Sequence, residues 1–178
     1  MADTQNPSST GSIFPGPTLS GKTAVLEGLP HHPALKAILA WNPDALTEAK
    51  FDRGELTLTV GNDLIRPGCE TLQAAGYSFF EDMTAVDWYP SVPRFQLSYH
   101  LLSHVYKERI RLCAMVDEED PSVGSITSIW PGANYFEREV FDLFGIRFEG
   151  HPNLRRILMP DDWKGHPLRK DYPVEGYR

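Results

Sequence analysis

Alternation of apolar and polar side chains marks several strands in this chain. Segments 55–60 (ELTLTV), 95–104 and 109–116 alternate clearly, and this period of two is typical of strands with one buried face. A further strand is expected over 77–88. The short gap between the last two alternating segments favours a hairpin.

Three segments are expected to be helical. One begins at Pro33, a residue type suited to a first helical turn, and ends before Pro43. A second, short helix covers 69–75. A third covers 125–144, where Pro131 allows a break. The order helix, strand, helix, strands, helix predicts an α+β fold, with helices packed on an antiparallel or mixed sheet, rather than a doubly wound parallel sheet.

The last thirty-odd residues follow neither period. A Gly-His-Pro phrase at 150–152 recurs at 165–167, and four prolines oppose regular structure there. This arginine-rich segment needs a surface to lie on: its own domain, a protein partner or a polyanion. The sequence therefore predicts a disordered N-terminal tail over 1–24, an α+β domain over 25–145 and a long irregular C-terminal strap over 146–178.

Charge is unevenly distributed along the chain. The net charge is −7, with 10 Lys/Arg against 19 Asp/Glu in residues 1–146 and 7 against 5 in residues 147–178. An acidic body argues against a nucleic-acid binder, which would carry a basic face. No apolar run of about 18 residues predicts a membrane span, and the first residues do not resemble a secretory signal, so a cytoplasmic location is expected.

Three patterns suggest chemistry but are expected to carry none. Residues 16–23 fit the phosphate-loop pattern G-x4-G-K-T, yet no buried strand precedes them and Pro17 withholds a backbone amide. His100 and His104 fall in an alternating strand, where their α-carbons would be about 13 Å apart, too far to share zinc easily. Two distant cysteines, Cys69 and Cys113, are expected to be reduced structural thiols.

Segment 135–145 reads as an amphipathic helix with one broad apolar arc. Arg138 and Asp142 lie opposite the arc and can pair at i,i+4 spacing. Glu137 does not fit this pattern, because it falls inside the arc. A buried carboxylate is costly unless a cation or several donors meet it.

The expected partners of Glu137 are Arg155, Arg156 or His151, which the turn after the helix could bring back. A structural ion pair that clamps helix to strap is the favoured interpretation. A catalytic acid or base is disfavoured, because no nucleophile or second buried carboxylate accompanies Glu137. The sequence predicts no catalytic, cofactor-binding or metal-binding residue.

The same region carries a family resemblance. Segment 137–144 reads ERE-x-x-DLF, His151 follows after six residues, and R-x-IL begins at Arg155. This pattern resembles the signature of the 30 kDa subunit, also called the C subunit, of respiratory NADH:quinone oxidoreductase (complex I, NDH-1). Residues 160–173 (PDDWKGHPLRKDYP) continue the resemblance, and the upstream segments TAVDW (84–88) and YHLLS (99–103) extend it, so that it covers about residues 30–173.

The resemblance implies a supporting role in an electron-transfer complex. In the family, the C subunit belongs to the hydrophilic arm and packs mainly on the quinone-site D subunit, near the cluster-bearing B subunit and the ferredoxin-like I subunit. FMN and iron–sulfur clusters lie in other subunits, and electrons pass from NADH to a quinone, coupled to ion pumping by the membrane arm. The chain would lie on the cytoplasmic side of the cell membrane, or on the matrix side in a mitochondrion.

Two alternatives remain open from the sequence. The chain could serve a related assembly, such as a photosynthetic NDH complex or a membrane-bound hydrogenase, or it could be a stand-alone phosphate-loop nucleotide binder. The resemblance assigns assembly roles to these residues: Glu137, Arg138, Glu139, Asp142, Gly145, His151, Arg155, Arg156, His166, Arg169 and Lys170.

Overall fold

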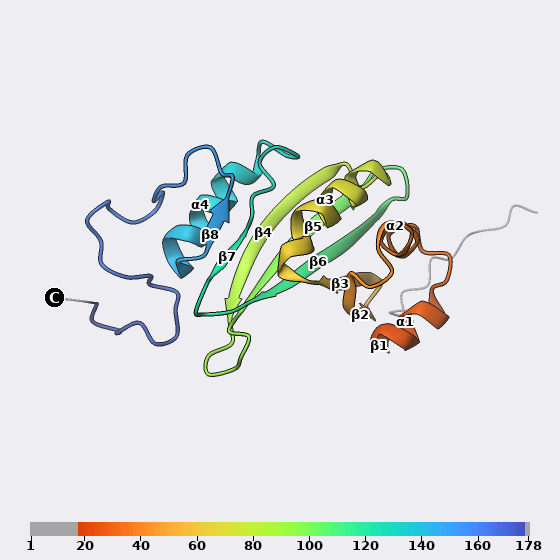
Figure 1. Ribbon diagram of the computed structural model, residues 1–178, viewed down its shortest axis with the longest axis horizontal. Helices are drawn as coiled ribbons and strands as arrows, with labels where there is room; N and C mark the ends of the chain where they lie inside the picture. The colour runs from red at the N-terminus through yellow and green to blue at the C-terminus, as the bar shows by residue number, and fades with distance from the viewer. Residues whose placement is uncertain (1–17, 177–178) are drawn as a thin grey trace, which may run out of the picture.

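The computed structural model describes residues 18–176 and is built on a six-stranded mixed sheet (Figure 1). The strand order is β1-β2-β3-β6-β5-β4, and β3 and β6 run parallel whereas the other neighbours are antiparallel. The strands are β1 (Leu19–Ser20), β2 (Leu46–Asp52), β3 (Glu55–Val60), β4 (Phe79–Asp87), β5 (Phe95–Ser103) and β6 (Glu108–Val116).

Helices cover one face of this sheet, and a small second sheet lies beside it (Figure 1). In the second sheet β7 and β8 pair in parallel. These elements are α1 (Lys22–Gly28), α2 (Pro33–Trp41), a 3₁₀ turn (Asn62–Leu64), α3 (Ile65–Ala74), β7 (Ser122–Gly124), α4 (Ala133–Phe144) and β8 (Arg147–Glu149). The predicted α+β class with a mixed sheet is confirmed.

The core lies between the sheet and the helices because alternate strand residues face the same side. Leu97, Tyr99 and Leu101 of β5 are fully buried, and their cross-strand neighbours Ala114, Leu112 and Ile110 on β6 are buried too. Cross-strand apolar pairs of this kind are the main stabilising unit of a sheet. The alternation read from the sequence therefore identified the buried face, and the predicted hairpin of β5 and β6 is confirmed.

Several predicted boundaries differ from the observed ones. The helix expected over 125–144 is confined to Ala133–Phe144, because residues 125–126 use their backbone amides for contacts outside a helix. Helix α3 begins at Ile65, earlier than expected, since Pro67 fits a first helical turn. Strand β2 had no clear periodic signal.

The expected N-terminal tail over 1–24 overlaps ordered elements at its end. Strand β1 pairs with β2, and α1 begins at Lys22. Residues 1–17 lie outside the described residues.

The C-terminal strap, residues 146–178, is irregular after β8 as far as it is described. It leaves β8, runs back along α4 and returns toward the end of β4 (Figure 1). The sequence left three possible surfaces for the strap: its own domain, a protein partner or a polyanion. The structure shows that the strap contacts its own domain. The contacts that hold it there concentrate at two places.

Candidate functional site at the junction of α4 and the strap

Asp142, in the last turn of α4, is the main acceptor between this helix and the strap. Its side chain is fully buried. Oδ2 accepts the backbone N–H groups of Ile157, Leu158 and Met159 at 3.0, 2.8 and 2.8 Å, and Oδ1 lies 2.6 Å from Nη1 of Arg156. Burial alone would raise the pKa of Asp142, but these donors outweigh it and hold the pKa below its usual value. The buried carboxylate is therefore ionised, and the guanidinium of Arg156 balances its charge.

Two arginines fix the path of the strap by donating hydrogen bonds to its backbone carbonyl oxygens. Arg156 donates through Nη2 to the carbonyl oxygens of Trp163 and Gly165 at 3.0 and 3.1 Å. Arg138 donates from α4 to the carbonyl oxygens of Arg155 and Arg156 at 3.1 and 2.9 Å. Arg138 therefore does not form the ion pair with Asp142 that their i,i+4 spacing allows, because its guanidinium binds the strap.

The carboxyl end of α4 receives four donors from the strap, one of which is Nη1 of Arg156, 3.2 Å from the carbonyl oxygen of Asp142. The carbonyl oxygens of the last three helical residues accept from Nδ1 of His166 (2.9 Å), the N–H of Leu168 (3.1 Å) and Nε of Arg169 (2.6 Å). Such carbonyls have no partner within the helix, and a cation suits the negative end of the helix dipole. The strap therefore acts as the cap of α4.

Gly145 makes this close approach feasible. It follows α4 with φ = 76°, in the left-handed region that favours glycine. A Cβ atom at this position would lie 2.5 Å from Nε2 of His166 and 2.9 Å from Nη2 of Arg169. Both the conformation and the contact exclude a side chain here.

A second anchor, which sequence reasoning missed, joins the strap to the end of β4. Arg94 is only 2% exposed and pairs with Asp87 through Nε–Oδ1 (3.0 Å) and Nη2–Oδ2 (2.8 Å). The same guanidinium contacts Asp171 of the strap and Glu118 of the turn after β6, and the N–H of Lys170 donates to Oδ2 of Asp87 at 2.8 Å. One buried cation thus joins three segments.

The electrostatics of this second anchor favour the charged forms. Burial raises the pKa of Asp87, but the bidentate bonds from Arg94 and the backbone donors outweigh it and lower the pKa to about 2. The guanidinium groups of Arg94 and Arg169 lie 5.0 and 5.1 Å from the centre of the Phe95 ring. Asp87 and Asp171 fall in segments that the family resemblance includes, whereas Arg94 lies in a loop with no periodic signal.

Glu137 is fully buried but does not contact the strap. Its Oε2 accepts from the hydroxyl of Ser125 at 2.6 Å, and its Oε1 accepts the N–H of Ile126 at 2.7 Å. The expected pairing with a strap cation is therefore wrong. Burial raises the pKa of Glu137 to about 7, and its two hydrogen bonds only partly oppose that rise. This carboxyl group holds the loop between β7 and α4.

The remaining predicted residues divide into one contact and three exposed side chains. His151 lies with Nε2 3.3 Å from the carbonyl oxygen of Asn134, and its Nδ1 accepts a backbone N–H, so Nε2 carries the proton. Burial lowers the pKa of His151 and favours this neutral form. Glu139, Arg155 and Lys170 are exposed. The structure thus brings most of the predicted residues together around α4 and leaves these three facing outward.

The patterns set aside in the sequence have ordinary structural roles. Lys22 donates to the carbonyl oxygen of Leu46 at 2.6 Å, and β1 lies within the phosphate-loop pattern. Nε2 of His100 accepts from Nε of Arg111 at 2.8 Å. Within residues 18–176 no cluster of three or more His, Cys, Asp or Glu is arranged for a metal ion.

Both cysteines are buried and unpaired with each other. In the described part of the chain, no helix is both long and apolar enough to cross a bilayer.

The polar groups at the two anchors are hydrogen-bonded or ion-paired with one another, and these contacts hold the strap against the domain. Carboxylates, guanidinium groups and helix-end carbonyls are each matched by a partner of opposite character. Arrangements of this kind provide bidentate, charge-assisted bonds with defined geometry. The site is therefore a structural junction between domain and strap.

Known proteins resemble this chain in sequence. A family model described as "Respiratory-chain NADH dehydrogenase, 30 Kd subunit" matches residues 58–178. The chain is 47% identical over 143 residues to the C subunit of NADH-quinone oxidoreductase from Roseiflexus sp. strain RS-1, covering 79% of this chain and 82% of that protein. The C subunit of the same enzyme from Roseiflexus castenholzii is 50% identical over 135 residues, covering 74% and 78%.

Two solved structures show the same likeness. One, the trypsin-resistant fragment (1-134) of Nqo5, is 35% identical, with a TM-score of 0.52 over 57% of this chain and 83% of that chain. A chain of the membrane-bound sulfane sulfur reductase, an archaeal respiratory membrane complex, is 29% identical, with a TM-score of 0.69 over 79% and 84%. The signature around α4, the fold and these relatives agree: the chain belongs to the 30 kDa subunit family of respiratory-chain NADH dehydrogenases, the C subunit of NADH-quinone oxidoreductase.

Proposed function

We propose that this chain is a non-catalytic structural subunit in the hydrophilic arm of a proton-translocating NADH:quinone oxidoreductase. Electrons pass from NADH through FMN and iron–sulfur clusters, which other subunits hold, to a quinone. The strap docks on the quinone-site D subunit, with the B subunit nearby and the I subunit as a further neighbour. The chain is peripheral on the cytoplasmic side of the membrane, or on the matrix side in a mitochondrion, and meets the membrane only through the complex.

The main support for this proposal is that the strap differs between its inner and outer surfaces. Its inner polar groups bind α4, whereas its outer surface leaves large apolar side chains uncovered. Burying one such side chain stabilises a contact by about 1.5–3 kcal/mol, and aromatic residues are enriched in interface cores. The exposed fractions are 56% for Leu158, 40% for Trp163, 51% for Leu168 and 104% for Val174.

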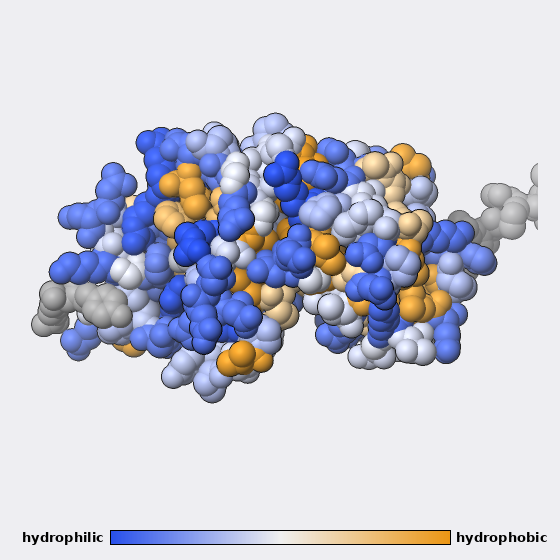
Figure 2. All heavy atoms as spheres, in the orientation of Figure 1, coloured by the Kyte–Doolittle hydropathy of each residue, from blue (hydrophilic) through white to orange (hydrophobic). Residues whose placement is uncertain are grey.

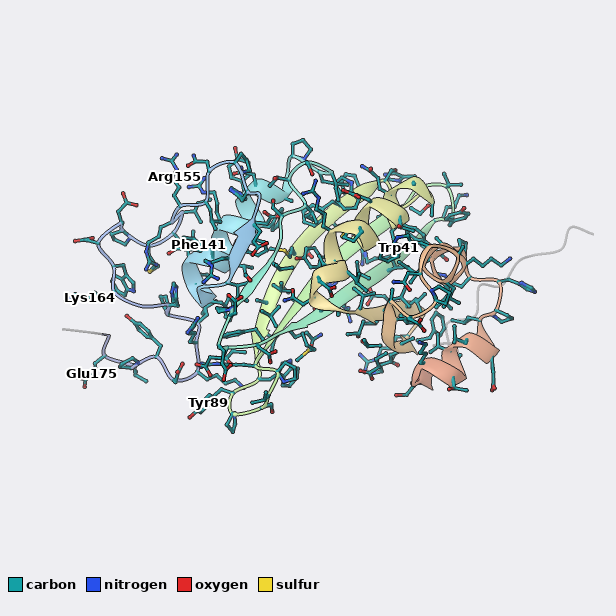
Figure 3. The ribbon with its side chains drawn as sticks, in the orientation of Figure 1. Trp41, Tyr89, Phe141, Arg155, Lys164 and Glu175 are labelled. Atoms are coloured by element: carbon teal, nitrogen blue, oxygen red, sulfur yellow. The ribbon has the colours of Figure 1, made fainter. Side chains whose placement is uncertain are left out.

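Exposed cationic side chains of the strap also suit binding to a protein partner. Arg155 and Lys164, labelled on the strap in Figure 3, are both exposed. Arginine side chains suit bidentate contacts to carboxylates of a neighbour. The solved Nqo5 relative is a trypsin-resistant fragment, which supports dividing this chain into a domain over 25–145 and a strap over 146–178.

Purification of the tagged full chain from its own cells tests the proposal. We expect FMN, iron and NADH-driven quinone reduction to co-purify with it. A Trp163→Asp/Leu168→Asp variant should fold but be missing from the complex, because two apolar contacts of the strap are replaced by charges. Val105→Asp is the control, since Val105 is 75% exposed but lies in the turn after β5. Normal incorporation of the strap variant would contradict the proposal.

A second candidate assembly rests on the likeness to the archaeal membrane complex. Subunits of this fold could serve a related complex, such as a photosynthetic NDH complex or a membrane-bound hydrogenase. The electron donor separates the candidates. Purified complex that accepts electrons from ferredoxin or hydrogen, and not from NADH, would support this second assignment.

A further inference from the structure

A groove between two loops lies beside the second anchor. One wall is the loop after β4, residues 88–94, and the other is the turn after β6, residues 117–120. The groove encloses about 470 Å³. Its lining includes Tyr89, Val92, Arg94, Asp117, Glu118 and Glu119.

The first wall is apolar and uncovered. Val92 is 88% exposed and Tyr89 is 49% exposed, with Trp88 47% exposed beside them. Figure 2 shows a small apolar patch near the tip of this loop, and Figure 3 labels Tyr89 on the same loop. Large apolar side chains gathered on one loop in this way mark interaction surfaces rather than ordinary solvent-facing positions.

The loop that carries this wall is held in shape. The N–H of Trp88 donates to the carbonyl oxygen of Arg94 at 2.8 Å, and the N–H of Ser91 donates to the carbonyl oxygen of Trp88 at 2.8 Å. The guanidinium of Arg94 lies 5.0 Å from the centre of the Tyr89 ring. Because the apolar wall is positioned in advance, a ligand would lose less free energy in ordering it.

The second wall carries more carboxylates than the neighbouring arginines of the chain neutralise. Four consecutive acids occupy 117–120. Glu118 pairs with Arg94, which already faces two other carboxylates, and Asp120 lies 2.6 Å from Nη2 of Arg147. Asp117 and Glu119 have no cationic partner among residues 18–176. The uncompensated charge therefore faces the apolar wall across the groove.

We propose that this groove binds an extended segment of a neighbouring subunit of the same complex. That segment places a lysine or arginine side chain between Asp117 and Glu119, and an apolar side chain against Tyr89 and Val92. The inference rests on the proposed function, because it requires assembly with other subunits. The groove is continuous with the strap through the contact of Arg94 with Asp171, so one partner can occupy both surfaces.

Photo-crosslinking in the assembled complex tests the occupant. A benzophenone amino acid replaces Val92 in the full chain, the complex is irradiated, and the adduct is sequenced. We expect an adduct with another subunit, in a peptide that carries a lysine or arginine within a few residues of the linked site. No adduct, or an adduct with a second copy, with residues 1–17 of this chain or with a peptide lacking a cation, would overturn the inference.

Two further positions separate this inference from the proposed function. Val105, also highly exposed, should give no adduct when it carries the same probe, whereas Leu168 should link the strap to its partner. An adduct at Leu168 with none at Val92 rejects the groove and leaves the strap assignment standing. Absence of both adducts from a chain that fails to co-purify with the complex rejects both.

Charge reversal tests the acidic wall directly. The double variant Asp117→Lys/Glu119→Lys should enter the complex at least about tenfold less than the original chain when both are co-expressed, a ratio that corresponds to about 1.4 kcal/mol. The control variant is Asp44→Lys/Glu48→Lys, which reverses two exposed acids near β2 at the other side of the sheet. Equal incorporation of both variants, with unchanged thermal unfolding, would refute the charge complementarity.

Discussion

Replacing Asp142 by asparagine should release the strap from α4 while leaving the domain folded. The substitution keeps the size of the side chain and removes its charge. An asparagine oxygen can still accept N–H groups of residues 157–159, but its amide nitrogen would then face the guanidinium of Arg156 as donor against donor. The ion pair at 2.6 Å is lost, and Arg156 keeps only carbonyl partners.

The expected loss follows from two contributions. Removing one partner of a buried ion pair costs about 3–5 kcal/mol, and charge-assisted hydrogen bonds are roughly twice as strong as neutral ones. The remaining contacts of Arg156 with three backbone carbonyl oxygens, at 3.0, 3.1 and 3.2 Å, offset part of this loss. We therefore expect the strap to be destabilised by about 3–4 kcal/mol, or about 10²–10³-fold in the population of the open form.

Hydrogen exchange of the amides that Asp142 accepts is the direct assay. The N–H groups of Ile157, Leu158 and Met159 should exchange about 10²–10³-fold faster in the variant under native conditions. Amides of β5 and β6 should keep their protection, because the core does not change. Glu139→Gln is the matched control, since Glu139 is exposed on the same helix and should change nothing.

The pH dependence gives an independent check on the same residue. The pKa of Asp142 is lowered in the folded chain, so its contribution is present above the unfolded pKa of about 4 and is lost as the pH falls through the folded value. The Asp142→Asn variant should lack this acid-dependent loss. If amides 157–159 were protected equally in both proteins, the account of Asp142 as the main acceptor would be refuted.

Three further predictions follow from other buried groups. In the original chain, the stability should fall by about 3 kcal/mol between pH 4.5 and 7, because the raised pKa of Glu137 means that ionisation of this buried carboxyl group disfavours the folded state. Glu137→Gln should abolish this fall. Thermal unfolding at several pH values is the assay, and an unchanged pH dependence in the variant counts against the prediction. Arg94→Ala should lower the free energy of unfolding in urea by about 3–5 kcal/mol, whereas Arg109→Ala, at an exposed pair, should cost at most about 1 kcal/mol; equal losses would exclude the buried anchor. Gly145→Ala should cost more than Gly54→Ala, since both have positive φ but only the first meets neighbouring atoms; equal melting temperatures would contradict the close contact.

The contacts around α4 depend partly on a local sequence pattern and partly on segments that are distant in the sequence. Asp142 was predicted as a family-signature residue, yet helical periodicity placed it on the polar face, and its burial comes from the strap that covers it. Glu137 was correctly expected to be buried, but its partners lie in the preceding loop and not in the strap. Periodicity reports which face is covered and not which segment covers it.

The amino-acid sequence was sufficient for the α+β class, the alternating strands, the irregular strap and the family, because these depend on local period, proline positions and a short motif. The fold-back of the strap, the anchor at Arg94 and the cap of α4 required the three-dimensional arrangement. Arg94 and Asp171 are separated by 77 residues, and nothing local in either segment selects the other. Contacts between distant polar groups depend on how the sheet and helix place their ends, which is a property of the packed chain.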